Sequence, residues 1–222
     1  MNILILAGGQ GTRLRSEVPD IPKVMAPMAD GKPFLEYLIN YVRKYDPEKI
    51  ILATGYKAQV IKDYFADKVI YSNEGEPLGT AGAIRLVHKI IFGSSSPLIV
   101  INGDTFFGID LALFAKRHIE HGAWASLALT RVTDTQRYAK VMINYAYRVL
   151  ALRRGEVGKG LISGGIFAFN PDALKYFPDK GSLEEDVIVK RPYFTESQGV
   201  PDVNVISKIQ ITWNDGKITV ID

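Results

Sequence analysis

The first half of the chain alternates between short apolar runs and segments with apolar residues at helical spacing. Apolar runs predict strands at residues 2–7, 49–53, 69–71 and 98–101. Amphipathic spacing predicts helices at residues 33–44, 58–65, 79–90 and 111–121. Strands that alternate with helices form a mostly parallel sheet with helices on both faces. The pattern therefore predicts an α/β fold, a doubly wound, Rossmann-like sheet.

The second half of the chain is richer in strands. Strand-like segments follow one another with little helical pattern between them, at residues 124–132, 140–143, 148–152 and 162–169. We expect these to add antiparallel or mixed strands to the same sheet. Near the end, residues 209–213 and 217–221 flank Asn214-Asp215-Gly216, which is a strong hairpin signal. No linker-like composition divides the halves, so we expect a single domain over residues 1–222.

Composition narrows the classes of protein. The 222 residues include no cysteine, which excludes disulfides and thiolate zinc sites and suits a reducing compartment. No apolar run approaches the roughly 20 residues that span a bilayer, and residues 1–7 do not resemble a signal peptide. The net charge is +3 and the basic residues are scattered. We expect a cytoplasmic protein that binds a small anion, with neither nucleic acid nor a membrane as partner.

A glycine-rich loop follows the first predicted strand. Gly8, Gly9 and Gly11 stand where backbone N–H groups meet the carboxyl edge of the sheet, and glycine permits close backbone approach to phosphate. Arg13 could add a bidentate clamp on phosphate oxygens. The loop matches neither the P-loop nor the dinucleotide fingerprint. A tight βα turn that happens to be rich in glycine is the alternative.

Ordered motifs over most of the chain resemble those of the sugar-1-phosphate nucleotidyltransferases. They are Leu6-Ala7-Gly8-Gly9-x-Gly11-Thr12-Arg13-Leu14, Pro22-Lys23, Glu76-Pro77-Leu78-Gly79-Thr80-Ala81-Gly82-Ala83, Asn102-Gly103-Asp104, Arg137-Tyr138 and Gly164-Gly165. Several details within these motifs are similar to the heptose-1-phosphate guanylyltransferases. The resemblance implies a GT-A-like fold with a nucleotide-binding half at residues 1–108 and a sugar-phosphate-binding half at residues 109–202. The tail of residues 203–222 is atypical for the family.

The resemblance also implies a reaction. A sugar 1-phosphate attacks the α-phosphorus of a nucleoside triphosphate and pyrophosphate leaves, and GTP with D-glycero-D-manno-heptose 1-phosphate is the favoured pair. The sugar phosphate is already mostly ionised at neutral pH, so no general base is needed. The protein supplies positioning and charge neutralisation. Two alternatives remain, a UTP- or dTTP-dependent enzyme acting on a hexose 1-phosphate, and a catalytically impaired homologue that binds nucleotide sugars and regulates. A homo-oligomer is also possible.

Each expected site residue takes its role from these motifs. The catalytic residues are Arg13, Lys23 and Asp104. The nucleotide-binding residues are Leu6, Ala7, Gly8, Gly9, Gly11, Thr12, Gly79, Thr80, Asn102 and Gly103. The sugar-phosphate residues are Arg137, Tyr138, Arg153, Arg154, Gly164 and Gly165. Lys23 could instead be an ordinary surface lysine, and Asp104 could instead cap a turn.

The expected cofactor is Mg²⁺, which takes hard oxygen ligands such as carboxylates and substrate phosphates. Asp104 is one expected ligand. Relatives complete the site with an aspartate near the C-terminus, and here Glu196 or Ser197 stands at that position, of which Glu196 is the expected ligand. Relatives also carry a Glu-Lys pair where this chain has Arg153-Arg154, so an arginine would replace the lysine. We expect His118 and His121 to form a solvated helix end.

Overall fold

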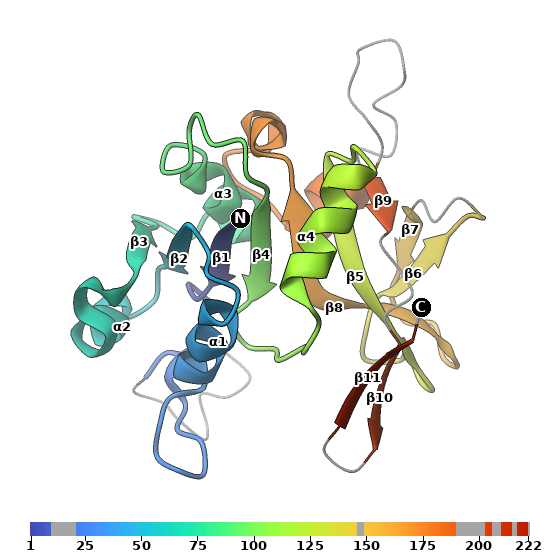
Figure 1. Cartoon of the computed structure of the whole chain (residues 1–222), viewed down its shortest axis with the longest axis horizontal. Coiled ribbons are helices and arrows are strands. Elements are labelled where there is room, and N and C mark those ends of the chain that lie inside the picture. The colour runs from blue at the N-terminus through green and yellow to red at the C-terminus, as the bar shows by residue number, and fades with distance from the viewer. Residues whose placement is uncertain (10–20, 146–148, 190–202, 206–209, 215–216, 222) are drawn as a thin grey trace.

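The computed structural model describes residues 1–9, 21–145, 149–189, 203–205, 210–214 and 217–221, with side chains up to residue 188. In this part of the chain, nine strands form one mixed sheet in the order β3-β2-β1-β4-β8-β5-β9, and β6 and β7 extend it beside β8 (Figure 1). The α/β fold class is confirmed. No helix in the described residues is long and apolar enough to cross a membrane.

The parallel part of the sheet contains β1 (Asn2–Leu6), β2 (Lys49–Thr54), β3 (Ile70–Asn73) and β4 (Leu98–Asn102). β1 lies between β2 and β4, and Leu6 is in register with Ala53 on one side and Asn102 on the other. The chain runs from β1 through β2 to β3 and then crosses back to β4. The strand order thus reverses between β1 and β4, and doubly wound folds bind ligands in the crevice at the carboxyl edge of such a switch point.

Helices cover both faces of this sheet because its strands are apolar on both sides. Ile3 and Ile5 pack with the buried residues of α1 (Phe34–Arg43), α2 (Ala58–Phe65) and α4 (Leu111–Glu120). Leu4 packs on the opposite face with α3 (Gly79–Val87). Side chains alternate between the two faces along a strand, so neighbours on β1 enter separate cores.

Short helices lie between these elements. Three are 3₁₀-helices, η2 (Lys23–Met25), η3 (Ala66–Lys68) and η4 (Pro171–Tyr176), and η5 (Leu183–Val189) is a π-helix. The predicted helix 79–90 ends as α3 at Val87, where the chain tightens into a turn closed by His88 N donating to Arg85 O. The other predicted strands and helices are confirmed to within about two residues at either end, as expected for boundaries drawn from sequence.

The second half of the chain extends the sheet with antiparallel strands, as predicted. β8 (Gly160–Phe169) pairs antiparallel with β4 and with β5 (Ala125–Val132), so it joins the two halves through one sheet. β6 (Lys140–Ile143) and β7 (Val149–Arg153) form an antiparallel pair beside β8. The sequence did not predict β9 (Val203–Val205), a three-residue strand parallel to β5.

The predicted C-terminal hairpin is confirmed. β10 (Gln210–Asn214) and β11 (Lys217–Ile221) pair antiparallel, with Asn214 opposite Lys217. They form a two-stranded sheet apart from the main one, drawn in dark red below it in Figure 1.

His118 corrects one expectation. Its side chain is 2% exposed and not solvated, and Nδ1 lies 2.8 Å from the Ser126 hydroxyl on β5. His118 follows Phe114 by one helical turn on the buried face of α4, whereas His121 is exposed at the helix end. Burial lowers the pKa of His118 to about 4, so its imidazole is neutral at physiological pH.

Candidate active site

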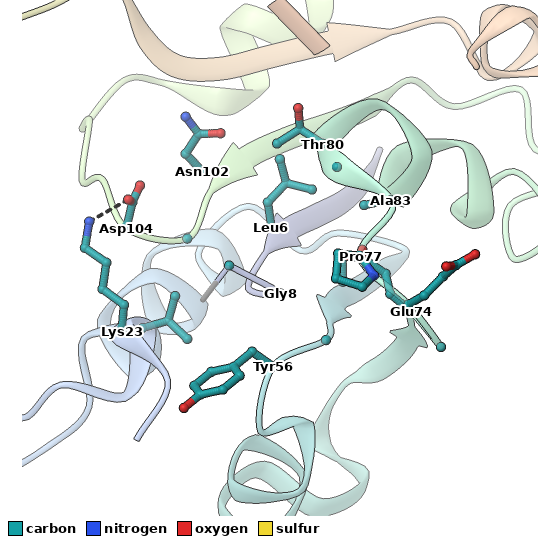
Figure 2. Close-up of a pocket in the computed structure, with 18 residues that line it drawn as sticks. Leu6, Gly8, Lys23, Tyr56, Glu74, Pro77, Thr80, Ala83, Asn102 and Asp104 are labelled. Atoms are coloured by element: carbon teal, nitrogen blue, oxygen red, sulfur yellow. Dashed lines mark hydrogen bonds and ion pairs between the residues drawn. The ribbon is translucent and has the colours of Figure 1, made fainter. Parts of the chain in front are cut away.

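A cavity of about 830 Å³ lies at the carboxyl edge of the four parallel strands (Figure 2). The end of each strand, or the segment that follows it, contributes to the wall. The wall consists of Leu6, Gly8 and Gly9 at and after the end of β1, Ala53, Gly55 and Tyr56 at and after the end of β2, Glu74, Gly75, Glu76 and Pro77 after β3, and Asn102, Gly103 and Asp104 at and after the end of β4. Lys23, Val24, Gly79, Thr80 and Ala83 complete it. The cavity therefore lies at the sheet edge where the strand order predicts a ligand-binding crevice.

An ion pair lies at one end of this cavity. Lys23 Nζ is 2.7 Å from Asp104 Oδ2, and both side chains are partly exposed (Figure 2). Asp104 stands two residues beyond the end of β4, and Lys23 begins η2, whose Val24 and Met25 are buried and anchor it. The structure thus brings together a cation and a carboxylate from segments 81 residues apart.

Close backbone packing sets the position of Asp104. The Gly103 N–H donates to the Leu6 carbonyl at 3.0 Å, and a Cβ at residue 103 would overlap that carbonyl oxygen. Only glycine allows the two strand ends to approach so closely. The contact with β1 therefore fixes where the chain leaves β4, and with it the position of Asp104.

Glu74 lies at the other end of the cavity, near Pro77 (Figure 2). Its Oε2 accepts a hydrogen bond of 3.0 Å from the Leu78 backbone N–H, and a Cβ at Gly8 would lie 2.8 Å from Oε1. Burial raises the pKa of Glu74 above its usual value, and the Leu78 hydrogen bond opposes that effect. The Glu74 carboxyl group therefore lies close to Gly8 while it accepts a hydrogen bond from the turn before α3.

The structure assembles most of the residues predicted to bind nucleotide. Leu6, Gly8, Gly9, Gly79, Thr80, Asn102 and Gly103 all line the cavity, together with Lys23 and Asp104. Ala7 does not: it is 1% exposed, packs in the core, and its N–H donates to Ala53 O. Gly11, Thr12, Arg13 and Glu196 lie outside the described residues.

The residues expected to bind sugar phosphate are not among those that line the cavity. Arg137 and Tyr138 lie on an exposed segment between β5 and β6. Arg153 pairs with Glu156 at 3.3 Å, and Arg154 pairs with Glu184 at 3.1 Å. Their roles stay predictions.

The two glycines expected beside the sugar, Gly164 and Gly165, are buried in β8. A Cβ at Gly164 would overlap the Phe107 ring. Gly165 has φ +75°, and a Cβ there would lie 3.1 Å from Asn102 Nδ2. Gly164 therefore makes room for Phe107, which follows β4, and Gly165 makes room for Asn102, the last residue of β4.

Sequence reasoning missed several residues in the wall. Tyr56 follows β2, and Glu74 and Gly75 follow β3, yet these positions carried no assigned role. The sequence could have indicated these residues, because they directly follow predicted parallel strands, whose carboxyl ends meet at one edge of the sheet.

The described residues fit a magnesium ion held partly by substrate. They contain no cluster of three or more histidine, cysteine, aspartate or glutamate residues that could hold a metal. Asp104 nevertheless presents a carboxylate to the cavity, next to a lysine suited to phosphate. Mg²⁺ commonly uses one or two carboxylates plus phosphate oxygens, so a single described carboxylate is compatible with it.

Fold and cavity together define an α/β protein with a ligand-sized cavity and a charged pair at its topological switch point. Comparison with known proteins agrees: residues 2–215 match the Nucleotidyl transferase family. The chain belongs to this family.

Similar proteins carry more specific names. The chain is 42% identical to the D-glycero-alpha-D-manno-heptose 1-phosphate guanylyltransferase of Campylobacter jejuni, with 83% of this chain and 84% of that protein covered. It is 38% identical to the enzyme of the same name from Aneurinibacillus thermoaerophilus, with 86% and 84% covered. HddC from Yersinia pseudotuberculosis, solved in complex with GMP-PN, is 35% identical with a TM-score of 0.76, and 92% of this chain and 89% of that chain are covered.

Proposed function

We propose that the protein transfers a guanylyl group from GTP to D-glycero-D-manno-heptose 1-phosphate, which yields GDP-heptose and pyrophosphate. The observation that carries the proposal is the Lys23–Asp104 pair inside a cavity at the β1/β4 switch point. The choice of base and sugar is supported by the names of relatives that are 42% and 38% identical over most of the chain.

In this reaction a phosphate oxygen of the sugar attacks the α-phosphorus of GTP. A new P–O bond forms there, the bond from the α-phosphorus to the bridging oxygen breaks, and pyrophosphate leaves with the electron pair. The attacking phosphate has a second pKa of about 6, so it needs no side chain to remove a proton. The work of the protein is to hold two repelling anions in line.

We assign the neutralising role to Lys23. Its ammonium group is a compact cation in the cavity wall, 2.7 Å from Asp104, and can move from this carboxylate to phosphate oxygens with little change in position. The backbone of Gly8 and Gly9 can be approached closely by phosphates, and among the described residues nothing lies within 4 Å of an added Cβ on Gly9. Arg13 is expected to bind the β- and γ-phosphates.

We assign Mg²⁺ binding to Asp104, with Glu196 as the expected second ligand. When bound, the ion would offset phosphate charge as a Lewis acid. Asp104 would then exchange its contact with Lys23 for the ion, which leaves the lysine available to the reacting phosphates. Since nucleoside triphosphates are cytoplasmic metabolites, we place the reaction in the cytoplasm.

Release of pyrophosphate by the purified protein tests the proposal. GTP with D-glycero-D-manno-heptose 1-phosphate and Mg²⁺ should give the highest kcat/KM. GTP with mannose 1-phosphate tests the sugar, and UTP or dTTP with glucose 1-phosphate tests the hexose-specific alternative. Highest activity with UTP or dTTP would replace the guanylyl assignment. Binding of triphosphate without pyrophosphate release from any pair would favour the regulatory homologue. Light scattering of the same sample would test whether the protein forms a homo-oligomer.

A further inference from the structure

Helix α3 begins without a side-chain cap. Its N-cap residue is Leu78, which cannot accept a hydrogen bond through its side chain, although the first turn of a helix leaves N–H groups in need of acceptors. The Gly181 carbonyl accepts from the Ala81 N–H at 2.9 Å, and the Gly181 N–H donates to the Leu78 carbonyl at 2.8 Å. A turn about a hundred residues away in sequence thus caps α3 at the end of the helix that lines the cavity.

The glycines of the Gly79-Thr80-Ala81-Gly82 motif serve this contact. A Cβ at Gly79 would overlap the Gly181 carbonyl, and a Cβ at Gly82 would overlap the Asp179 carbonyl. Gly79 also has φ +72°, which other residues adopt only with strain. Both glycines therefore allow the backbone of residues 179–181 to lie directly against the start of α3.

The same turn orients a polar group of the cavity wall. The Leu183 N–H donates to Thr80 Oγ1 at 2.7 Å. A hydroxyl that accepts this bond keeps its own proton for another acceptor. Because Thr80 lines the cavity, that proton is available to an oxygen of a bound ligand.

Asp186 holds the turn in shape. Its Oδ2 accepts from the Ser182 N–H at 2.7 Å and lies 2.7 Å from the position that a Cβ on Gly181 would occupy. Hydrogen bonds to a carboxylate are stronger than those between neutral groups. None of residues 179–186 lines the cavity, so Asp186 would influence a ligand indirectly, through the turn that contacts α3 at Gly181 and Leu183.

We propose that residues 179–186, here called the clamp, are a positioning element for the nucleotide loop of residues 74–83, with Asp186 as the positioning residue. Leu78 stands at the centre of this arrangement, since its carbonyl accepts from Gly181 and its N–H donates to Glu74 Oε2. Through these bonds the clamp fixes Thr80 and Glu74 at the cavity wall. The proposal rests on the proposed function in one respect, that a nucleotide binds in this cavity.

Binding of a non-hydrolysable GTP analogue, measured by calorimetry, tests the clamp without requiring turnover. Asp186→Ala should weaken the analogue about tenfold, the loss expected for one charged hydrogen bond. Asp186→Asn retains an acceptor oxygen and should recover most of the affinity. Asp172→Ala is the control, because it removes an exposed carboxylate on η4 that lies outside both the clamp and the cavity wall. Its affinity should equal that of the wild type.

A structural defect alone would affect both substrates, so the KM for sugar 1-phosphate is measured in parallel. It should stay within about twofold of wild type in Asp186→Ala while nucleotide affinity falls. Equal nucleotide affinity in Asp186→Ala and wild type would overturn the proposal. So would a matching loss in Asp172→Ala.

Hydrogen exchange on the wild-type protein covers the case in which Asp186→Ala does not fold. Coupling between sites is reciprocal, so the bound analogue should slow exchange at the Ala81, Gly181 and Leu183 amides. Unchanged exchange at Gly181 and Leu183 would overturn the clamp. If the wild-type protein binds the analogue but releases no pyrophosphate, the proposed function is refuted. The binding and exchange data then still decide whether the clamp positions the nucleotide. A wild-type protein that binds no nucleotide would refute both.

Discussion

Lys23 Nζ and Asp104 Oδ2 lie 2.7 Å apart, in side chains that are 35% and 44% exposed. An ion pair so open to solvent adds at most about 1 kcal/mol to stability, because water screens it. Both groups nevertheless line the cavity, where a phosphate or a metal ion can compete for them. The pair is therefore better suited to function than to holding the fold together.

Replacing Lys23 separates these roles. Lys23→Met keeps the length of the side chain and removes the charge, so the melting temperature should change little. Loss of a cation that stabilises developing phosphate charge should lower kcat/KM by roughly 10²–10³-fold. Calorimetry and pyrophosphate release check the two expectations. Lys32→Met is a suitable control, since Lys32 is an exposed lysine outside the cavity. Near-normal activity in Lys23→Met would remove Lys23 from the mechanism.

Asp104→Asn tests the metal assignment. The amide preserves shape but binds Mg²⁺ poorly, so turnover should fall by roughly 10²–10³-fold and half-saturation should need much more Mg²⁺. Glu196→Gln should shift the Mg²⁺ titration in the same direction if Glu196 is the second ligand. An unaltered titration in Asp104→Asn would contradict the assignment of Asp104. The same result in Glu196→Gln would point instead to Ser197, to Asp202 a few residues later in the sequence, or to water.

Two glycines of the cavity should respond differently to alanine. Gly103→Ala would place a Cβ against the Leu6 carbonyl and should lower the free energy of unfolding by about 2 kcal/mol or more. Gly9→Ala meets none of the described residues within 4 Å and should leave stability unchanged. If phosphates approach the Gly9 backbone, Gly9→Ala should still raise the KM for GTP. Denaturant unfolding and initial-rate kinetics measure these effects, and a strongly destabilised Gly9→Ala would contradict the account.

His118 should make stability depend on pH. Its pKa is about 4 in the folded protein and 6.5 when unperturbed. Between these values the unfolded state binds more protons, so stability should fall as the pH drops below 6.5 and level off near 4. The loss should reach about 3 kcal/mol. Urea unfolding across this range should show the slope in wild type and in His121→Gln, but much less of it in His118→Gln. An equal slope in His118→Gln would assign it to other groups.

Local pattern was sufficient to predict the parallel core. Apolar runs such as residues 98–101 form strands because both their faces are buried, and the helical spacing of residues 33–44 matches one buried face of α1. The hairpin around Asn214-Asp215-Gly216 is likewise a local preference of the turn residues. β9 was not predicted, because three residues carry too little pattern to distinguish them from a loop.

The candidate site also has features that the sequence determined and features that depend on the tertiary structure. The sequence by itself determined which segments carry chemistry, since Gly8, Lys23 and Asp104 belong to motifs readable along the chain. The sequence also indicated that these segments meet at the carboxyl edge of the sheet, because the carboxyl ends of parallel strands lie at the same edge.

Only the tertiary structure decided which distant groups touch. It placed Lys23 against Asp104, brought Glu74 beside Gly8, and set Gly181 as the cap of α3. It also buried His118, which sequence reasoning assigned to solvent. These contacts depend on how separate segments pack. A contact made by a backbone carbonyl, or one that needs the space beside a glycine, cannot be read from the sequence, because many residue types could form it.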